Sequence, residues 1–182
     1  DFDFIRNTGR TRINVNGQIE ELSNNIVALD YQNGCPEILL EPQRTNLVKH
    51  SNDLTNPQWD KETGVTLTTI NDSNSVIKDG SYNKIFSDIS DREVKLNTDI
   101  SINNKPYTQF IIVKKDTSDT IRVDLRFIEN GTINYACYFD FTTKEFINFG
   151  GDTAERLQVL ELSNGWYKLG ITGFSQTSNQ SR

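Results

Sequence analysis

The chain has 182 residues, 35% of them apolar and 24% charged. This suits one domain, or one domain with an appendage, and excludes a disordered chain or a disulfide-stapled scaffold. No apolar segment approaches the roughly 18 residues that a membrane-spanning helix needs, so we expect no membrane insertion. A net charge of −6 lacks the excess of Lys and Arg that neutralising phosphates requires, so we expect no nucleic-acid partner.

A β-hairpin is predicted at residues 11–22, where apolar and polar residues alternate on both sides of Asn16-Gly17. Asn-Gly tolerates the positive φ angles of a type I′ turn, so we expect a two-residue turn there. The hairpin would carry one apolar face, made of Ile13, Val15, Ile19 and Leu22. A lone hairpin cannot bury such a face, so its partner is either the rest of the chain or another subunit.

Two shorter strands are expected at residues 25–30 and 37–41, separated by a turn at residues 33–36. Few apolar residues follow at 49–57, which indicates a boundary. We therefore expect an N-terminal β-arm over residues 1–46 and a second unit over residues 47–182. Pro42 pushes Glu41 towards extended geometry, so residues 41–46 are expected to form a structural turn between the two units.

The second unit consists of short strand-like segments divided by polar turns. They lie at residues 64–70, 82–87, 93–96, 107–114, 121–128, 135–141, 145–149, 156–162 and 166–174. This spacing favours an all-β jelly roll or sandwich over a parallel α/β sheet. The pair Gly150-Gly151 is expected to form a turn after one of these strands.

Alternation along three strands predicts which side chains face the core. The inward set is Ile121, Val123, Leu125, Phe127, Tyr135, Cys137, Phe139, Phe141, Tyr167, Leu169 and Ile171. If the three strands share a sheet, its outer face collects Arg122, Asp124, Arg126, Tyr138, Asp140, Trp166 and Lys168. Two cysteines, Cys35 and Cys137, permit one disulfide without implying it, and we expect two buried thiols.

Catalytic chemistry has little support in the sequence. The single histidine, His50, lies in the polar break, and the chain has no zinc-ligand spacing and no phosphate-binding loop. A glycosidase pair stays open in principle, but Glu37, Glu41, Asp124 and Asp140 are expected to be solvated carboxylates. Asn52, Asp53 and Asp60 offer oxygens to calcium, although a turn explains them better. We expect no enzyme, no cofactor and no metal.

Glycan binding is the better hypothesis, because an exposed aromatic ring beside hydrogen-bonding groups suits a sugar. The candidate residues are Trp166, Arg122, Asp124, Arg126 and Tyr138. Trp166 would stack on the sugar, and the arginines would hold the carboxylate of an acidic sugar. The alternative is that Trp166 packs under a loop or against a neighbouring chain, since Trp is normally buried.

The segment Ile38-Leu-Leu-Glu-Pro-Gln-Arg-Thr-Asn-Leu47, followed by Ser51 and Trp59, resembles a segment of bacteriophage tail-fibre and head-fibre proteins. Residues 11–20, 29–31 and 34–36 resemble the stretch that leads into it. Asp79-Gly80, residues 107–115 and Asn164-Gly-Trp-Tyr-Lys168 resemble later strands of the carbohydrate-binding-module-like jelly roll that follows in those proteins.

This resemblance implies a non-catalytic virion module, outside the cell, whose partners are other virion proteins, further copies of itself in a trimer, and a host-surface glycan. Proteins of this kind are expected to have one or two more strands after residue 174, so we expect a sandwich truncated at its C-terminus. Two alternatives remain: a carbohydrate-binding module of a secreted bacterial polysaccharide-degrading enzyme, and a catalytic sandwich that cleaves a polysaccharide.

Overall fold

The computed structural model describes residues 5–6, 10–39, 47–48, 50–77, 80–89, 92–96, 105–127, 133–151, 154 and 156–175. The described part is all-β, as predicted: its strands form small antiparallel sheets, and its helical content is one short 3₁₀ turn at Ser163–Gly165. The chain divides into two compact units, residues 1–99 (unit 1) and 100–182 (unit 2). The predicted turn at residues 41–46 lies outside the described residues, and the division between the compact units falls later than the predicted boundary at 46/47.

Unit 1 begins with the predicted hairpin, formed by β1 (Arg10–Ile13) and β2 (Ile19–Leu22). Its turn differs from the prediction, because only Gly17 has a positive φ, of 74°, whereas a type I′ turn needs two such residues. The side chain of Asn14 explains the difference. Its Oδ1 accepts hydrogen bonds from the N–H groups of Asn16 and Gln18, both at 3.0 Å, and this stabilises a longer loop.

The hairpin does not carry the single apolar face that was predicted. Ile13 and Ile19 pair directly and share one face, but Leu22 pairs with Arg10 on the other face. The reason is that Ile19 and Leu22 are an odd number of residues apart, so their side chains point to opposite sides. Val15 lies in the turn and is 73% exposed.

Backbone and side-chain hydrogen bonds tie the hairpin to other parts of unit 1. The Ile19 N–H donates to the Val76 carbonyl at 2.6 Å, and the Gln18 amide donates to the Ser75 carbonyl at 3.3 Å. Ser75 and Val76 are fully buried. On the other side of the hairpin, Asp30 accepts from the Ile13 N–H at 2.9 Å. Asp30 belongs to the pair β3 (Leu29–Asp30) and β4 (Glu37–Ile38).

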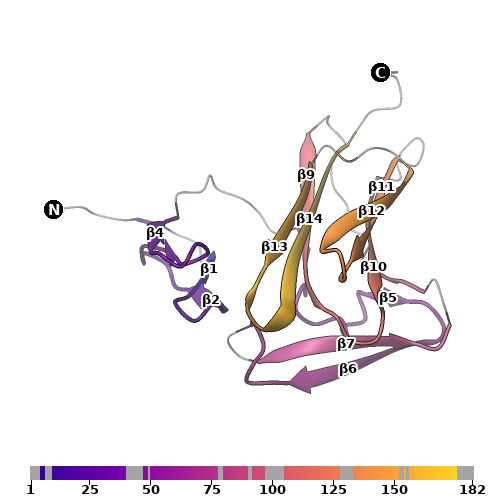
Figure 1. Cartoon of the computed structure of the whole chain (residues 1–182), viewed down its shortest axis with the longest axis horizontal. Coiled ribbons are helices and arrows are strands. Elements are labelled where there is room, and N and C mark those ends of the chain that lie inside the picture. The colour runs from indigo at the N-terminus through magenta and orange to yellow at the C-terminus, as the bar shows by residue number, and fades with distance from the viewer. Residues whose placement is uncertain are drawn as a thin grey trace. The chain divides into compact units, whose positions relative to one another are not determined.

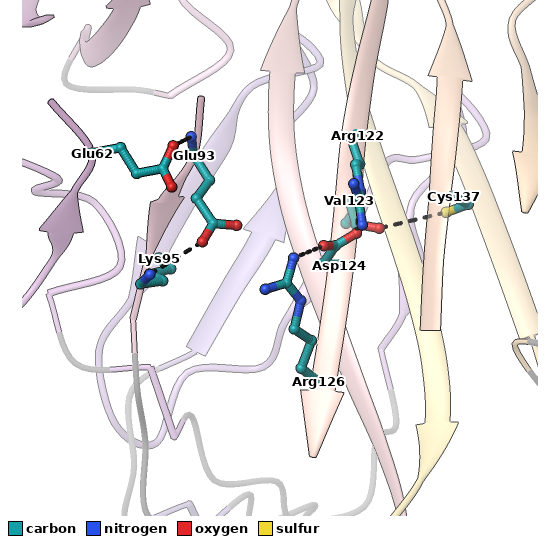
Figure 2. A network of polar contacts seen from close by, with 8 residues as sticks. All are labelled: Glu62, Glu93, Lys95, Arg122, Val123, Asp124, Arg126 and Cys137. Atoms are coloured by element: carbon teal, nitrogen blue, oxygen red, sulfur yellow. Dashed lines mark hydrogen bonds and ion pairs between the residues drawn. The ribbon is translucent and has the colours of Figure 1, made fainter. Parts of the chain in front are cut away.

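Two further strand pairs complete unit 1, close to the positions expected from the sequence. They are β5 (Asp60–Lys61) with β8 (Val94–Lys95), and β6 (Val65–Asn71) with β7 (Ser81–Ser87). Near the first pair, the Glu62 carboxylate accepts from the Glu93 N–H at 3.3 Å, and the Glu93 carboxylate accepts from Lys95 at 3.2 Å (Figure 2).

Unit 2 contains two three-stranded antiparallel sheets (Figure 1). One sheet has the order β10 (Thr120–Phe127), β11 (Ile133–Asp140), β12 (Glu145–Gly151). The other has the order β13 (Arg156–Glu161), β14 (Trp166–Phe174), β9 (Pro106–Lys114). The predicted turn at Gly150-Gly151 is wrong: both glycines belong to β12 and pair with Ala136 and Tyr135, because a register shift beside Cys137 lets the ladder continue.

The two sheets of unit 2 share one hydrophobic core. Its buried members are Val123, Phe127, Tyr135, Cys137, Phe139, Tyr167, Leu169 and Ile171. The rings of Phe139 and Tyr167, one from each sheet, lie 5.2 Å apart between centroids. The inward faces predicted for β10, β11 and β14 are therefore confirmed, and the sheets pack face to face.

Tyr135 of β11 packs directly against β14 of the other sheet. Its ring occupies the space over Gly173, where an ideal Cβ would lie 2.2 Å from the Tyr135 Cδ2. Its hydroxyl donates to the Phe174 carbonyl and accepts from the Phe174 N–H, both at 3.2 Å. One side chain of β11 is thus fitted to β14 by shape and by two hydrogen bonds.

We expect Gly173→Ala to lower the free energy of unfolding by about 1–3 kcal/mol, because the new methyl group must displace a buried ring from the core. Gly170→Ala is the matched control on the same strand, since its closest contact would be the ring of the exposed Phe110, which can move towards solvent. Urea denaturation of both variants checks this. Equal losses for the two variants would contradict the role of the Tyr135 contact.

The two cysteines have different environments, and the predicted pair of buried thiols is wrong for Cys35. Cys35 is exposed beside the turn that Gly34 closes by donating to the Tyr31 carbonyl, whereas Cys137 is fully buried, and both are free thiols. The Cys137 thiol lies 3.9 Å from the Val123 carbonyl, to which it donates (Figure 2). Burial raises the pKa of Cys137 to about 11, so this thiol stays protonated at neutral pH.

A thiol reagent should therefore modify one cysteine per native chain at neutral pH and two in denaturant. Cys35 reacts first because it is exposed, and Cys137 reacts only on unfolding because it is both buried and protonated. Spectrophotometric titration with a disulfide reagent measures this, and Cys35→Ser should remove the native-state reaction. Rapid reaction of two thiols in the native protein would contradict the burial of Cys137.

Candidate ligand-binding faces

Three of the predicted site residues form a row along β10. The outward side chains of this strand are Arg122, Asp124 and Arg126, as alternation requires. The Asp124 carboxylate accepts from Arg122 Nε at 2.8 Å and from Arg126 Nη2 at 2.5 Å (Figure 2). Each oxygen of one carboxylate therefore binds one guanidinium group.

Tyr138 joins this row from the neighbouring strand. It pairs with Arg122 in the register of β10 and β11, and the Arg122 Cζ lies 5.9 Å from the centroid of its ring. The hydrogen bond that Arg122 donates to Asp124 is the main cause that raises the pKa of Arg122 above its usual value. The structure thus brings together four of the five predicted residues. We call this outward side of β10, β11 and β12 the Arg122 face.

Trp166 does not belong to the Arg122 face, so the predicted common outer face is wrong. Trp166 and Lys168 lie on β14, in the sheet on the other side of the core. Trp166 is also only 4% exposed, so the expected exposed ring is absent. The alternative that Trp166 is packed away describes its environment better, and a sugar-stacking role would need a ring that solvent can reach.

The Arg122 face is not a cationic surface. Asp140 and Glu145 pair across β11 and β12, and alternation places them on the same side as Arg122, Asp124 and Arg126. Two guanidinium groups thus stand beside three carboxylates. Asp140 also accepts hydrogen bonds from the N–H groups of Thr142 and Thr143, at 2.6 and 3.2 Å. This face offers donors and acceptors, and no excess of positive charge.

The outward side of β13, β14 and β9 carries a feature that the sequence analysis missed. Phe110 of β9 is 45% exposed, and it pairs with Gly170 in the register of β9 and β14. The ammonium group of Lys168 lies 4.6 Å from the centroid of the Phe110 ring. We call this side the Phe110 face. Alternation in residues 106–114 could have assigned Phe110 outward, because Tyr107, Ile111 and Val113 are the inward residues.

The other polar candidates have structural roles. Asp53 accepts from the Thr55 N–H and hydroxyl at 3.1 and 2.5 Å, and the hydroxyl bond is the main cause that lowers the pKa of Asp53. The His50 carbonyl accepts from Trp59 Nε1 at 3.0 Å, and Asp60 pairs with Lys95 at 3.5 Å. Among the described residues, no group of three or more His, Cys, Asp or Glu side chains is placed to hold a metal ion.

Comparison with known proteins gives no family model, no curated protein and no solved structure that matches this chain. Within the described residues, no helix has the length and apolar character that crossing a membrane requires. The sequence motifs and the two outer faces of unit 2 are therefore the features from which a function can be inferred.

Trp166→Ala should lower the free energy of unfolding by about 3–5 kcal/mol, the usual cost of removing a large buried aromatic ring. Phe110→Ala is a matched control, because Phe110 projects from the same side of the same sheet but is 45% exposed. It should cost much less. Urea midpoints measure both effects, and a Trp166→Ala midpoint close to that of the wild type would show that the ring is accessible after all.

Proposed function

We propose that the chain is a non-catalytic structural module of a bacteriophage fibre or spike, located in the virion, outside the cell. Its sandwich would be a jelly roll of the lectin and carbohydrate-binding-module kind, and its task attachment to a host-surface glycan. The segments 38–47 and 164–168, which resemble phage fibre proteins, support this proposal. The all-β fold of the described residues and the face-to-face packing of two sheets in unit 2 are compatible with it.

The observation that carries the glycan part is the geometry of the Arg122 face. Arg122, Asp124 and Arg126 are held in one row by charge-assisted hydrogen bonds, and Tyr138 stands beside them. Sugar hydroxyl groups both donate and accept hydrogen bonds, so a fixed row of donors and acceptors beside an aromatic ring suits them. A rigid sheet also keeps such groups in place before the ligand arrives.

Assembly into a trimer is supported by the apolar surface of unit 1. Most of the exposed large apolar side chains among the described residues belong to this unit: Ile5, Val15, Ile26, Ile38, Leu47, Ile85, Phe86 and Ile89. Two of them, Ile85 and Phe86, are neighbours on β7, which pairs only with β6 among the described strands. Because Ile85 and Phe86 are consecutive, they leave an exposed apolar side chain on each face of the β6–β7 pair, and contact with another chain would cover them.

Light scattering on the purified protein at micromolar concentration should give three times the 20.8 kDa of one chain. The double variant Ile85→Lys/Phe86→Lys should give a smaller species, because two charges then stand where the subunits would meet. Ile147→Lys is the matched control, since Ile147 is an exposed apolar residue of unit 2. A wild-type monomer would contradict the assembly proposal.

The same protein tests the glycan proposal on an array of bacterial surface polysaccharides. Binding to at least one class of polysaccharide is expected. An array without any bound polysaccharide would contradict the attachment role, whatever the oligomeric state.

A further inference from the structure

The Phe110 face differs in charge from the Arg122 face. Its outward residues include three cations, Lys114 of β9, Lys168 of β14 and Arg156 of β13. Alternation and register place no acidic residue among the described outward positions of these three strands. The whole chain has 25 acidic and 19 basic residues, so its net charge is negative. The outward charges of the Phe110 face have the opposite sign. Such a local excess attracts anionic partners despite the net charge.

An aromatic ring lies among these cations in a fixed position. The Phe110 atoms Cε1 and Cδ1 fill the space over Gly170, at 2.6 and 2.8 Å from where a Cβ would stand. On the other side of Gly170, the Gln158 Cβ lies 3.3 Å from that position. A side chain at residue 170 would push the ring away. The absence of a side chain therefore lets Phe110 lie across the sheet while it stays 45% exposed.

The three cations of the Phe110 face have different surroundings, and Lys168 is the one beside the ring. The Lys168 ammonium lies 4.6 Å from the ring centroid, a distance suited to a cation–π contact. The Arg156 guanidinium donates to the side-chain oxygen of Gln158, with Nε at 2.8 Å and Nη2 at 3.0 Å, in the amide orientation that satisfies both groups. Lys114 is exposed and pairs with Trp166 at the far end of the same face.

We propose that the Phe110 face binds an acidic polysaccharide, with a sugar ring stacked on Phe110 and its carboxylate held by Lys168. This inference rests on the proposed glycan-binding function and adds to it a second site with its own ligand class. A uronic acid combines an apolar C–H face with a carboxylate on the same ring. The Phe110 face combines an aromatic plane with the Lys168 ammonium, which lies over that plane and whose flexible stem lets it move aside to pair with the carboxylate. The Arg122 face is less suited to this ligand, since its carboxylates outnumber its guanidinium groups.

The experiment measures the affinity of immobilised polygalacturonate for the wild type and four variants. We expect Phe110→Ala to weaken binding about tenfold and Lys168→Gln about fivefold, with a smaller salt dependence for the latter. Phe86→Ala is the matched aromatic control, because Phe86 is 55% exposed but lies in unit 1. Arg126→Gln tests the Arg122 face as the competing site. The Phe86→Ala control should stay within about twofold of the wild type, and a greater loss in Arg126→Gln than in Lys168→Gln would assign the acidic ligand to the Arg122 face instead.

Dextran and inorganic polyphosphate serve as comparison ligands. Dextran lacks the carboxylate and polyphosphate lacks the sugar ring, so both should bind at least about tenfold more weakly than polygalacturonate. Equal binding of polyphosphate would overturn the assignment of a sugar and leave a general polyanion surface. Phe110→Trp gives a positive test, since a larger aromatic plane should retain or strengthen binding, and urea midpoints confirm that each variant is folded.

The failure of this inference can be told apart from the failure of the proposed function. If polysaccharides bind and only Arg126→Gln weakens the binding, glycan attachment stands and the Phe110 face is not its site. If polysaccharides bind but acidic ones bind no better than dextran, the ligand class is wrong. If neither polygalacturonate nor any polysaccharide of the array binds, the proposed function and this inference both fail.

Discussion

The fit of Tyr135 over Gly173 is the constraint on which the architecture of unit 2 depends. This contact holds β11 against β14 at one position in the core. The two hydrogen bonds between the Tyr135 hydroxyl and the Phe174 backbone set the orientation of β14 at that position. Once these strands are fixed face to face, every side chain that points out of one sheet is a core thickness away from those that point out of the other. The Arg122 face and the Phe110 face are therefore separate surfaces, and a ligand that contacts one does not reach the other.

The sequence was sufficient to predict the strands and their inward faces, because alternation is a local property of the chain. The strands around Val123, Phe139 and Leu169 were assigned correctly in this way. Strand pairing is a long-range property, and alternation does not determine it. Trp166 was therefore placed beside Arg122, although β14 pairs with β13 and β9. For the same reason, the sequence alone did not indicate that Gly150 continues a strand, since its conformation depends on its partner Ala136.

Net charge is an equally indirect guide to the surface. The sequence carries an excess of acidic residues, which argues against nucleic acid as a partner. It does not show how those charges are divided between faces. Asp124 and Glu145 stand on the Arg122 face, whereas the described outward positions around Lys168 carry cations only. Because a ligand meets the local field first, the division between faces has more influence on ligand choice than the total does.

Two glycines of β14 place aromatic rings on opposite sides of the same strand. Gly173 makes room for Tyr135 inside the core, and Gly170 makes room for Phe110 on the outside. They are three residues apart, so alternation turns one inward and the other outward. The inner ring contributes to stability, because it is buried and hydrogen-bonded. The outer ring contributes less, since almost half of it stays in contact with water. The Phe110 ring packs over Gly170 beside the Lys168 ammonium, and a ligand that covered it would bury apolar area that folding leaves exposed. This favours a role in recognition for Phe110.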